Sequence, residues 1–171
     1  MKITLDNNFL KKSHKHFITE FLLKSDFPYF LQPHSTFDDD YVMMEHIALR
    51  RYDNNWNTGN IEIYKDILDT FCKKHKIKYE KILRCSVNLT FNVGIEKSKI
   101  HVDHKEPHKQ LLIYLNKVKD KKSYTVICDD EKNIIKKVQP IQFRGLSFGS
   151  NYHFHYYPKI GHRIVLVYTF R

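Results

Sequence analysis

The sequence predicts a mostly β fold with helices near its N-terminus, in which a small barrel or sandwich is braced by two helices. Apolar residues recur with helical spacing only in the first half of the chain, up to residue 72. From residue 82 onward the apolar positions alternate and β-branched residues are frequent, as is typical of strands. About eight short strands fit into these last residues, which favours a barrel or sandwich over a helical bundle.

Two helices are expected upstream of the strands. The first begins at Asp6, whose carboxylate suits the N-cap position, and continues to about Lys24. The second begins near Thr58 or Asn60 and continues through Cys72. The apolar faces that predict them are Phe9, Leu10, Phe17, Ile18, Phe21 and Leu22 in the first helix, and Ile61, Tyr64, Ile67, Leu68, Phe71 and Cys72 in the second.

The strands are expected between and after the helices. Phe27–Gln32 and Tyr41–Arg50 lie between them, separated by prolines and by a solvated acidic turn at Asp38–Asp40. The strands expected downstream are Leu83–Val93, Ser98–Asp103, Gln110–Asn116, Tyr124–Cys128, Ile134–Val138, Gln142–Phe148, Tyr152–Tyr156 and Arg163–Phe170. Because the chain has no internal repeat and no Pro/Gly-rich linker, residues 1–171 are expected to form one domain, with 1–81 supporting a core of 82–171.

Composition excludes several classes of protein. With 42% hydrophobic and 14% aromatic residues, the chain is not disordered throughout. Its longest apolar runs, such as Ile164–Val167, are too short to span a bilayer, and no secretory signal is visible. Cys72, Cys85 and Cys128 are odd in number and lack CxxC spacing, which favours reduced thiols over disulfides or a zinc knuckle. We therefore expect a cytoplasmic protein without a membrane partner.

The net charge of +10 could attract an anionic partner such as nucleic acid. However, the basic residues are 23 Lys and only 6 Arg, and the lysines are scattered along the chain. This distribution favours a generally solvated basic surface over a dedicated nucleic-acid groove.

His101-Val102-Asp103 is the main candidate for chemistry. About one His-x-Asp triplet is expected by chance from eleven histidines and twelve aspartates, so the triplet alone is weak. At the end of a strand, however, His101 and Asp103 would project to the same face. A second histidine from a distant strand would complete a two-histidine, one-carboxylate set, which leaves three metal positions open in non-haem Fe(II) oxygenases.

The C-terminal region supplies such a histidine. His153 lies 50 residues after Asp103, and Arg163 follows ten residues later at the start of an apolar strand. Together with the strand that contains Tyr114, this order resembles the 2-oxoglutarate- and Fe(II)-dependent dioxygenases, particularly the small prolyl-hydroxylase-like members. In that family a His-x-Asp motif is followed by a distal histidine and then by a basic residue.

The resemblance implies a double-stranded β-helix (jelly-roll) barrel braced by the two helices. It implies Fe(II) held by His101, Asp103 and His153, and 2-oxoglutarate as cosubstrate, with its far carboxylate on Arg163 and help from Tyr114. Dioxygen and an unidentified primary substrate would be the other partners. A prolyl or other amino-acid side chain is the first expectation, and a peptide or small molecule is favoured over nucleic acid.

Several residue assignments remain open at this stage. His155 would point the same way as His153 in an extended strand and could replace it as ligand. A third possibility pairs His162 with Arg171, although Arg171 ends the sequence. Tyr114 could be a core aromatic residue only. Phe91 departs from the family, because some members carry a tyrosine there that helps hold the cosubstrate.

Two other functions also remain open. The first is a non-catalytic, cupin-like β-barrel binding module, and the second is an oxidative nucleic-acid demethylase. The family's demethylases carry Arg-x5-Arg after the distal histidine, whereas Thr169 stands six residues after Arg163. A zinc hydrolase could use the same three ligands but would give Arg163 no role. A buried Arg163 needs a partner, and a dicarboxylate matches its guanidinium in bidentate fashion.

Overall fold

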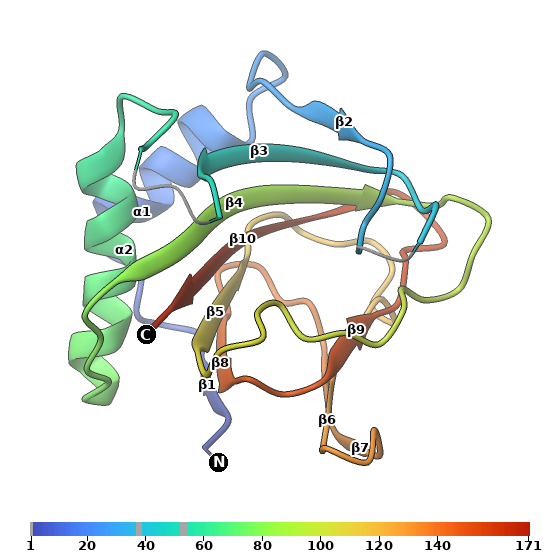
Figure 1. Cartoon of the computed structure of the whole chain (residues 1–171). Helices are drawn as coiled ribbons and strands as arrows, with labels where there is room; N and C mark the ends of the chain where they lie inside the picture. Colours follow the sequence, from blue (N-terminus) through green and yellow to red (C-terminus); the bar gives the residue numbers. More distant parts are fainter. Residues whose placement is uncertain (1, 37–38, 52–54) are drawn as a thin grey trace.

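The computed structural model describes residues 2–36, 39–51 and 55–171, so Asp38 of the expected acidic turn lies outside the described residues. Two antiparallel sheets dominate the structure (Figure 1). The larger has the strand order β1-β8-β5-β10-β4-β3-β2 and the smaller β7-β6-β9. The strands are β1 (Thr4–Asp6), β2 (Phe30–Gln32), β3 (Met43–Leu49), β4 (Ile82–Phe91), β5 (Lys109–Tyr114), β6 (Thr125–Cys128), β7 (Ile134–Val138), β8 (Gly145–Gly149), β9 (His153–His155) and β10 (His162–Phe170).

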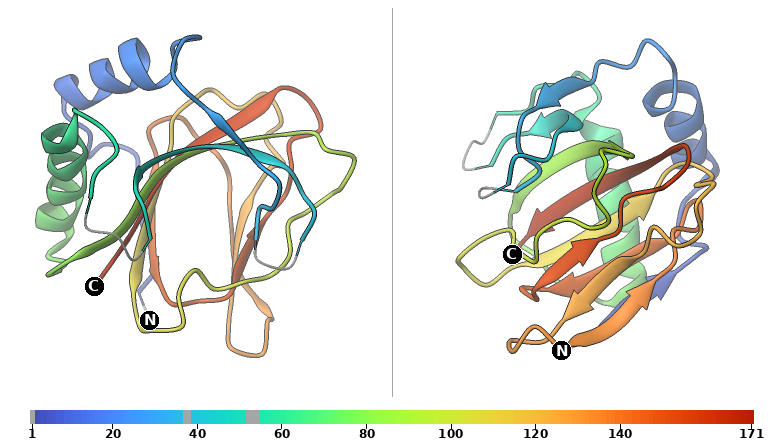
Figure 2. Two further views of the ribbon diagram at one scale, coloured as in Figure 1. Left: turned by 45° about the horizontal axis from the view of Figure 1, so that its top comes forward. Right: turned by 90° about the vertical axis from the view of Figure 1, so that its right-hand side faces the viewer.

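The helices cover one face of the large sheet. Helix α1 (Lys12–Phe17) continues into a π-helical turn, Ile18–Leu22, and α2 (Ile61–His75) is the longer helix. The views in Figure 2 place both on the side of this sheet opposite to the small sheet. Their apolar residues form one buried cluster with alternate residues of the central strands, among them Ile164, Leu166 and Tyr168 of β10.

The other face of the large sheet looks toward the small sheet. Strand β10 turns Arg163, Val165 and Val167 to this side, because successive side chains of a strand point to opposite faces. A second apolar cluster joins the sheets through Leu112, Tyr114, Ile127, Val138, Leu146, Phe148, Val165 and Val167. Polar residues of the same strands face the remaining space between the sheets.

The expectation of a mostly β fold with two upstream helices is confirmed. The second helix and most strands lie within a few residues of their expected bounds. The helix start at Asp6 is wrong, because Asp6 ends β1, which pairs with β8. Its carboxylate accepts a hydrogen bond from the Asn8 backbone and pairs with Lys74 and His75 of α2. Asp6 therefore ties a strand to a helix instead of capping one.

The strand expected at Ser98–Asp103 is also wrong. These residues are described but form no continuous strand: among them only His101 makes an isolated bridge, to His153, and the preceding residue Lys97 makes another, to Tyr156. Strand β9 has only three residues, so few backbone hydrogen bonds can form between it and this segment. The segment that contains the His-x-Asp motif is therefore a connection held at two points.

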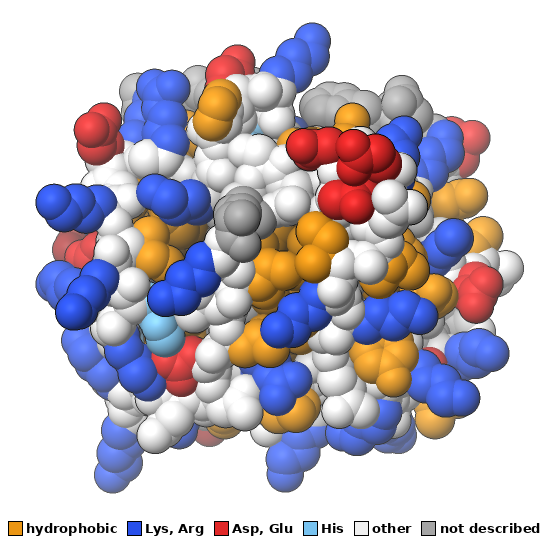
Figure 3. Space-filling model, turned by 90° about the horizontal axis from the view of Figure 1, so that it is seen from below, with side chains coloured by type: hydrophobic (Ala, Val, Ile, Leu, Met, Phe, Trp, Pro, Cys, Tyr) orange, Lys and Arg blue, Asp and Glu red, His pale blue; other side chains and the backbone are white. Residues whose placement is uncertain are grey.

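The surface has no continuous basic band on the face drawn in Figure 3, where Lys and Arg side chains are spread among apolar and uncharged groups. This distribution agrees with a solvated basic surface. Within the described residues, none of the helices has the length and apolar character needed to cross a membrane.

Candidate metal centre and cavity

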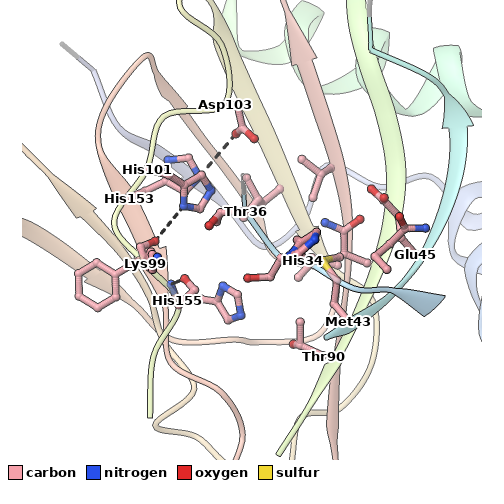
Figure 4. A pocket seen from close by; sticks show the side chains of 18 of the residues that line it. His34, Thr36, Met43, Glu45, Thr90, Lys99, His101, Asp103, His153 and His155 are labelled. Atoms are coloured by element: carbon pink, nitrogen blue, oxygen red, sulfur yellow. Dashed lines mark hydrogen bonds and ion pairs between the residues drawn. The ribbon is translucent and has the colours of Figure 1, made fainter. Parts of the chain in front are cut away.

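His101, Asp103 and His153 converge in space. Each offers one ligand atom, and these atoms lie within 4.8 Å of one another. His101 and His153 exchange both backbone hydrogen bonds, at 3.0 and 2.9 Å, and their rings lie 4.4 Å apart between centroids. The bridge between β9 and the connection before β5 therefore sets two imidazoles side by side, with the Asp103 carboxylate facing them (Figure 4).

The two imidazoles share the same tautomer. Nδ1 of His101 lies 3.0 Å from the Lys99 carbonyl oxygen, and Nδ1 of His153 lies 3.1 Å from that of Asn151. Because a carbonyl oxygen only accepts hydrogen bonds, each Nδ1 carries a proton, so that in the neutral form of either ring the lone pair is on Nε2. Backbone carbonyls commonly orient metal-binding histidines in this way. Burial, together with the charge of His101, lowers the pKa of His153 to about 4, so it is neutral at pH 7.

The Asp103 carboxylate lies between the histidines and two arginines. Its Oδ2 is 3.5 Å from His153 Nε2, whereas its Oδ1 is 3.4 Å from Arg51 Nη2 and 3.6 Å from Arg84 Nη1. Burial acts to raise the pKa of Asp103, but the neighbouring imidazoles and guanidiniums outweigh it and hold the pKa below its ordinary value. Asp103 is therefore an anion that can serve as a ligand at neutral pH.

The candidate ligands line a cavity of about 740 Å³ between the two sheets. In Figure 4, His101, His153 and Asp103 occupy one side, and Met43 and Glu45 of β3 and Thr90 of β4 occupy the other. Three buried polar atoms on lining residues lack a hydrogen-bond partner within the described structure: Gln110 Oε1, His155 Nε2 and Arg163 Nε. Such atoms are costly to bury alone, so they indicate a polar occupant.

Arg163 is 2% exposed, so it does not face solvent at the start of β10. Its Nη2 donates to Thr125 Oγ1 at 2.8 Å, and its guanidinium lies 5.4 Å from the centre of the Tyr114 ring. Among the described residues it forms no salt bridge, and burial lowers its pKa. A buried guanidinium without a carboxylate on the protein is suited to an anionic ligand.

Tyr114 lies behind Thr125 instead of lining the cavity. Its hydroxyl donates to Thr125 Oγ1 at 2.7 Å, and the Tyr114 side chain is fully buried. Thr125 does line the cavity, and the sequence did not single it out because an isolated threonine at a strand start carries no signal. Since Thr125 Oγ1 accepts from both Tyr114 and Arg163, its own hydrogen remains available for an occupant.

The alternative histidines are not among the converging ligand atoms. His155 lines the cavity but does not belong to the group of converging ligand atoms. Burial, followed by the charge of Arg163, lowers its pKa well below the ordinary value. His162 and Arg171 are both exposed and do not line the cavity, and neither does Phe91. Of the three pairings considered from the sequence, that of His162 with Arg171 lies off this cavity. His153 and His155 both line it together with Arg163, and of these two histidines only His153 belongs to the converging group.

A loop before β3 closes one side of the cavity. Pro33, His34, Ser35 and Thr36 line it, and the buried Asp39 carboxylate accepts hydrogen bonds from the Ser35 backbone and hydroxyl (2.7 and 2.6 Å) and from the Thr36 hydroxyl (2.7 Å). Burial acts to raise the pKa of Asp39, but these hydrogen bonds outweigh it and lower the pKa to about 2. Asp39 therefore stabilises the loop as an anion.

No family model matches the chain, and a search of curated proteins finds no significant match. Solved structures do match. An oxidoreductase of the 2OG-Fe(II) oxygenase family from Burkholderia pseudomallei has a TM-score of 0.77 at 13% identity, covering 98% of this chain and 84% of its own. The chain has the fold of the 2OG-Fe(II) oxygenases. The resemblance inferred from the order of His101, Asp103, His153 and Arg163 is thereby confirmed for the fold.

Two further enzymes of solved structure have a similar fold. A prolyl hydroxylase from Trichoplax adhaerens, solved with a peptide of hypoxia inducible factor, has a TM-score of 0.68 at 16% identity and covers 98% of this chain and 82% of its own. SnoN, a non-heme alpha-ketoglutarate-dependent epimerase from nogalamycin biosynthesis, has a TM-score of 0.68 at 8% identity, with coverages of 99% and 77%. The 2OG-Fe(II) oxygenase fold thus serves different reactions on different substrates.

Proposed function

We propose that this chain is an Fe(II)- and 2-oxoglutarate-dependent oxygenase with His101, Asp103 and His153 as the metal ligands. The observation that carries the proposal is their convergence: one ligand atom of each residue lies within 4.8 Å of the others, and Nδ1 of each histidine is hydrogen-bonded to a backbone carbonyl, which directs Nε2 to the metal. Two histidines and one carboxylate are the donor set expected for Fe(II) in such enzymes. The general reaction class is also that of the structural neighbours.

We further propose that the two sheets are the halves of a double-stranded β-helix, or jelly roll, and that residues 1–171 act as one domain. The opposed antiparallel sheets and the apolar cluster between them support this arrangement. Residues 1–81 would then brace a core formed by 82–171, since the N-terminal helices pack on β4, β5 and β10.

The cosubstrate would lie with its far carboxylate against Arg163 and Thr125. Arg163 offers a charge without a protein counter-ion and an unpartnered Nε, and Thr125 offers a hydroxyl hydrogen. Tyr114 would act through Thr125, whose hydroxyl it holds. When bound, iron, 2-oxoglutarate and dioxygen supply the oxidation of a C–H bond. The chain's part is to hold the metal in fixed geometry, orient the cosubstrate and exclude water from the cavity.

The other functions considered have less support. A non-catalytic barrel would not require converging ligands or a buried Arg163, and a zinc hydrolase would leave Arg163 unused. A nucleic-acid demethylase is disfavoured because Thr169 holds the place of the second arginine, and its hydroxyl is hydrogen-bonded to His104 at 2.7 Å. A prolyl or other amino-acid side chain, in a peptide or small molecule, is the proposed substrate class. The three buried free cysteines fit the proposed cytoplasmic location.

The test is anaerobic titration of Fe(II) and 2-oxoglutarate into the purified protein. We expect a visible metal-to-ligand charge-transfer band that requires both components, and succinate formation once oxygen is admitted. Asp103→Ala is expected to abolish both signals, because it removes the anionic ligand. A folded wild-type protein whose spectrum stays flat would contradict the proposal.

A further inference from the structure

The two oxygens of the Asp103 carboxylate have different surroundings. Oδ2 faces the histidines, at 3.5 Å from His153 Nε2. Oδ1 faces away from them, toward Arg51 Nη2 at 3.4 Å and Arg84 Nη1 at 3.6 Å. Arg51 also donates from Nη1 to the backbone carbonyl of Asp103 at 2.6 Å. One side of the carboxylate is thus engaged by guanidinium groups, and the other is left for a metal.

The arginines come from separate parts of the chain. Arg51 lies just after β3, and Arg84 lies near the start of β4. Arg84 is itself held by Glu45 of β3, whose carboxylate accepts a hydrogen bond from Arg84 Nη2. Arg84 thus faces two carboxylates, those of Glu45 and Asp103, which is what allows it to be largely buried. The arrangement is a built network and not a chance approach of flexible side chains.

This network supports a segment that lacks other regular support. Within residues 98–103, the described backbone pairing with β9 consists of the bridge at His101 and a hydrogen bond from Ser98 N to the His155 carbonyl oxygen at 2.9 Å, so Asp103 is two residues beyond it. Arg51 contacts both the carbonyl and the carboxylate of Asp103, which fixes its position and its rotation. A guanidinium fork can do this because its donors have rigid relative directions.

We propose that Arg51 and Arg84 are positioning residues that reserve Oδ1 of Asp103, so that this carboxylate gives the metal one oxygen only. The inference rests on the proposed function, in which Asp103 is a ligand. A carboxylate free to rotate could bind through both oxygens and occupy a further metal position. The guanidiniums would therefore preserve the three open positions that a chelating keto acid and dioxygen need.

The proposal predicts that removing these arginines affects the affinity for the metal and the affinity for 2-oxoglutarate differently. The guanidiniums repel a divalent cation nearby, so their removal should not weaken binding of the metal itself. Their removal should weaken binding of 2-oxoglutarate to the metal-loaded protein, because a bidentate Asp103 competes for the same positions. An arginine that merely stabilises the fold would affect both affinities alike.

The experiment compares Arg51→Gln with Arg171→Gln. Arg171 is exposed and does not line the cavity, so it controls for the loss of one positive charge. Co(II) alone is titrated first, and its visible absorption reports affinity and coordination number. The Fe(II) charge-transfer band is then titrated with 2-oxoglutarate under anaerobic conditions. A Glu45→Gln/Arg84→Gln double variant tests Arg84 without leaving a buried Glu45 unpaired.

For Arg51→Gln we expect 2-oxoglutarate to bind about tenfold more weakly, within the range typical of groups that orient metal ligands. Co(II) affinity should be equal to or higher than that of the wild type, with a changed absorption spectrum. Arg171→Gln should match the wild type. Equal losses of both affinities, or no change in either, would overturn the inference. If wild-type protein binds Co(II) but never gives the 2-oxoglutarate band, the proposed function fails, whereas the Co(II) spectra still show whether Arg51 controls the coordination.

Discussion

Arg163 donates a hydrogen bond from Nη2 to Oγ1 of Thr125, across 38 positions of sequence. Thr125 is uncharged, so this contact orients the guanidinium without neutralising it. The charge stays available to an anion that enters the cavity. Both residues come from strands on opposite sides of the cavity, β10 and β6, so their contact also joins the two sheets.

Arg163→Met should raise the KM for 2-oxoglutarate by about 10- to 100-fold, the usual weight of a hydrogen-bonded ion pair. Steady-state succinate formation at varied 2-oxoglutarate measures this. Arg171→Met is the matched control, because Arg171 is exposed at the end of the chain. A larger increase in KM for Arg171→Met than for Arg163→Met would contradict the proposal, because it would place the cosubstrate near the end of β10 instead of near its start.

Thr125→Val should weaken 2-oxoglutarate binding more than Tyr114→Phe does. Thr125 lines the cavity, whereas Tyr114 reaches it only through the Thr125 hydroxyl. Tyr114→Phe loses one buried hydrogen bond and should lower the free energy of unfolding by about 1–2 kcal/mol, whereas Thr125→Val loses two, from Tyr114 and from Arg163, and should lower it further. Isothermal titration with 2-oxoglutarate at saturating metal separates the two effects. If Tyr114→Phe is the more damaging variant for binding, the tyrosine touches the cosubstrate directly.

His153→Ala should lose more metal affinity than His155→Ala. His153 belongs to the converging group, and its Nδ1–H is held by the Asn151 carbonyl, which leaves Nε2 for the metal. The loss expected for His153→Ala is at least tenfold in Co(II) affinity, whereas His155→Ala should change it by less than about threefold. The reverse order would transfer the ligand role to His155.

Asp39→Asn should lower stability at neutral pH but not in strong acid. The pKa of Asp39 is lowered to about 2 in the folded protein, from an ordinary value of 3.8. Its ionised form therefore contributes stability above about pH 4, and this contribution disappears as the pH falls to about 2. We expect a difference of about 1–2 kcal/mol from wild type at pH 7 by urea unfolding. Asp40→Asn, at a neighbouring exposed carboxylate, is the control and should leave stability at pH 7 close to that of the wild type.

Much of the site could be predicted from the sequence because it depends on order along the chain. His101, Asp103, His153 and Arg163 lie on the same cavity, as their spacing indicates. The local argument for the first pair was nevertheless wrong in detail. His101 and Asp103 were expected to share a strand face, but the segment is held by one backbone bridge and by Arg51. Contacts between residues far apart in the sequence, such as Arg51 and Asp103, produce no periodic pattern of apolar residues from which they could be predicted.

The residues that were missed are those whose role depends on tertiary contacts. Thr125, Arg51, Arg84 and Glu45 are single polar residues in or beside strands, and their sequence neighbours give no hint of what they face. The wrong start of the first helix has a similar cause. Asp6 is a good capping residue by type, but pairing with β8 and ion pairs with α2 outweigh that local preference.

The backbone bridge between His101 and His153 has a practical consequence. An ion held by both side chains would cross-link segments separated by about fifty residues, so the melting temperature should rise with metal concentration. Saturation at about a hundred times the dissociation constant is worth roughly 2.7 kcal/mol. Any further compound that binds in the cavity of the metal-bound protein raises the free energy of unfolding further. Thermal melting in the presence of metal and a chemically inert keto-acid analogue could therefore screen candidate substrates before any product has been identified.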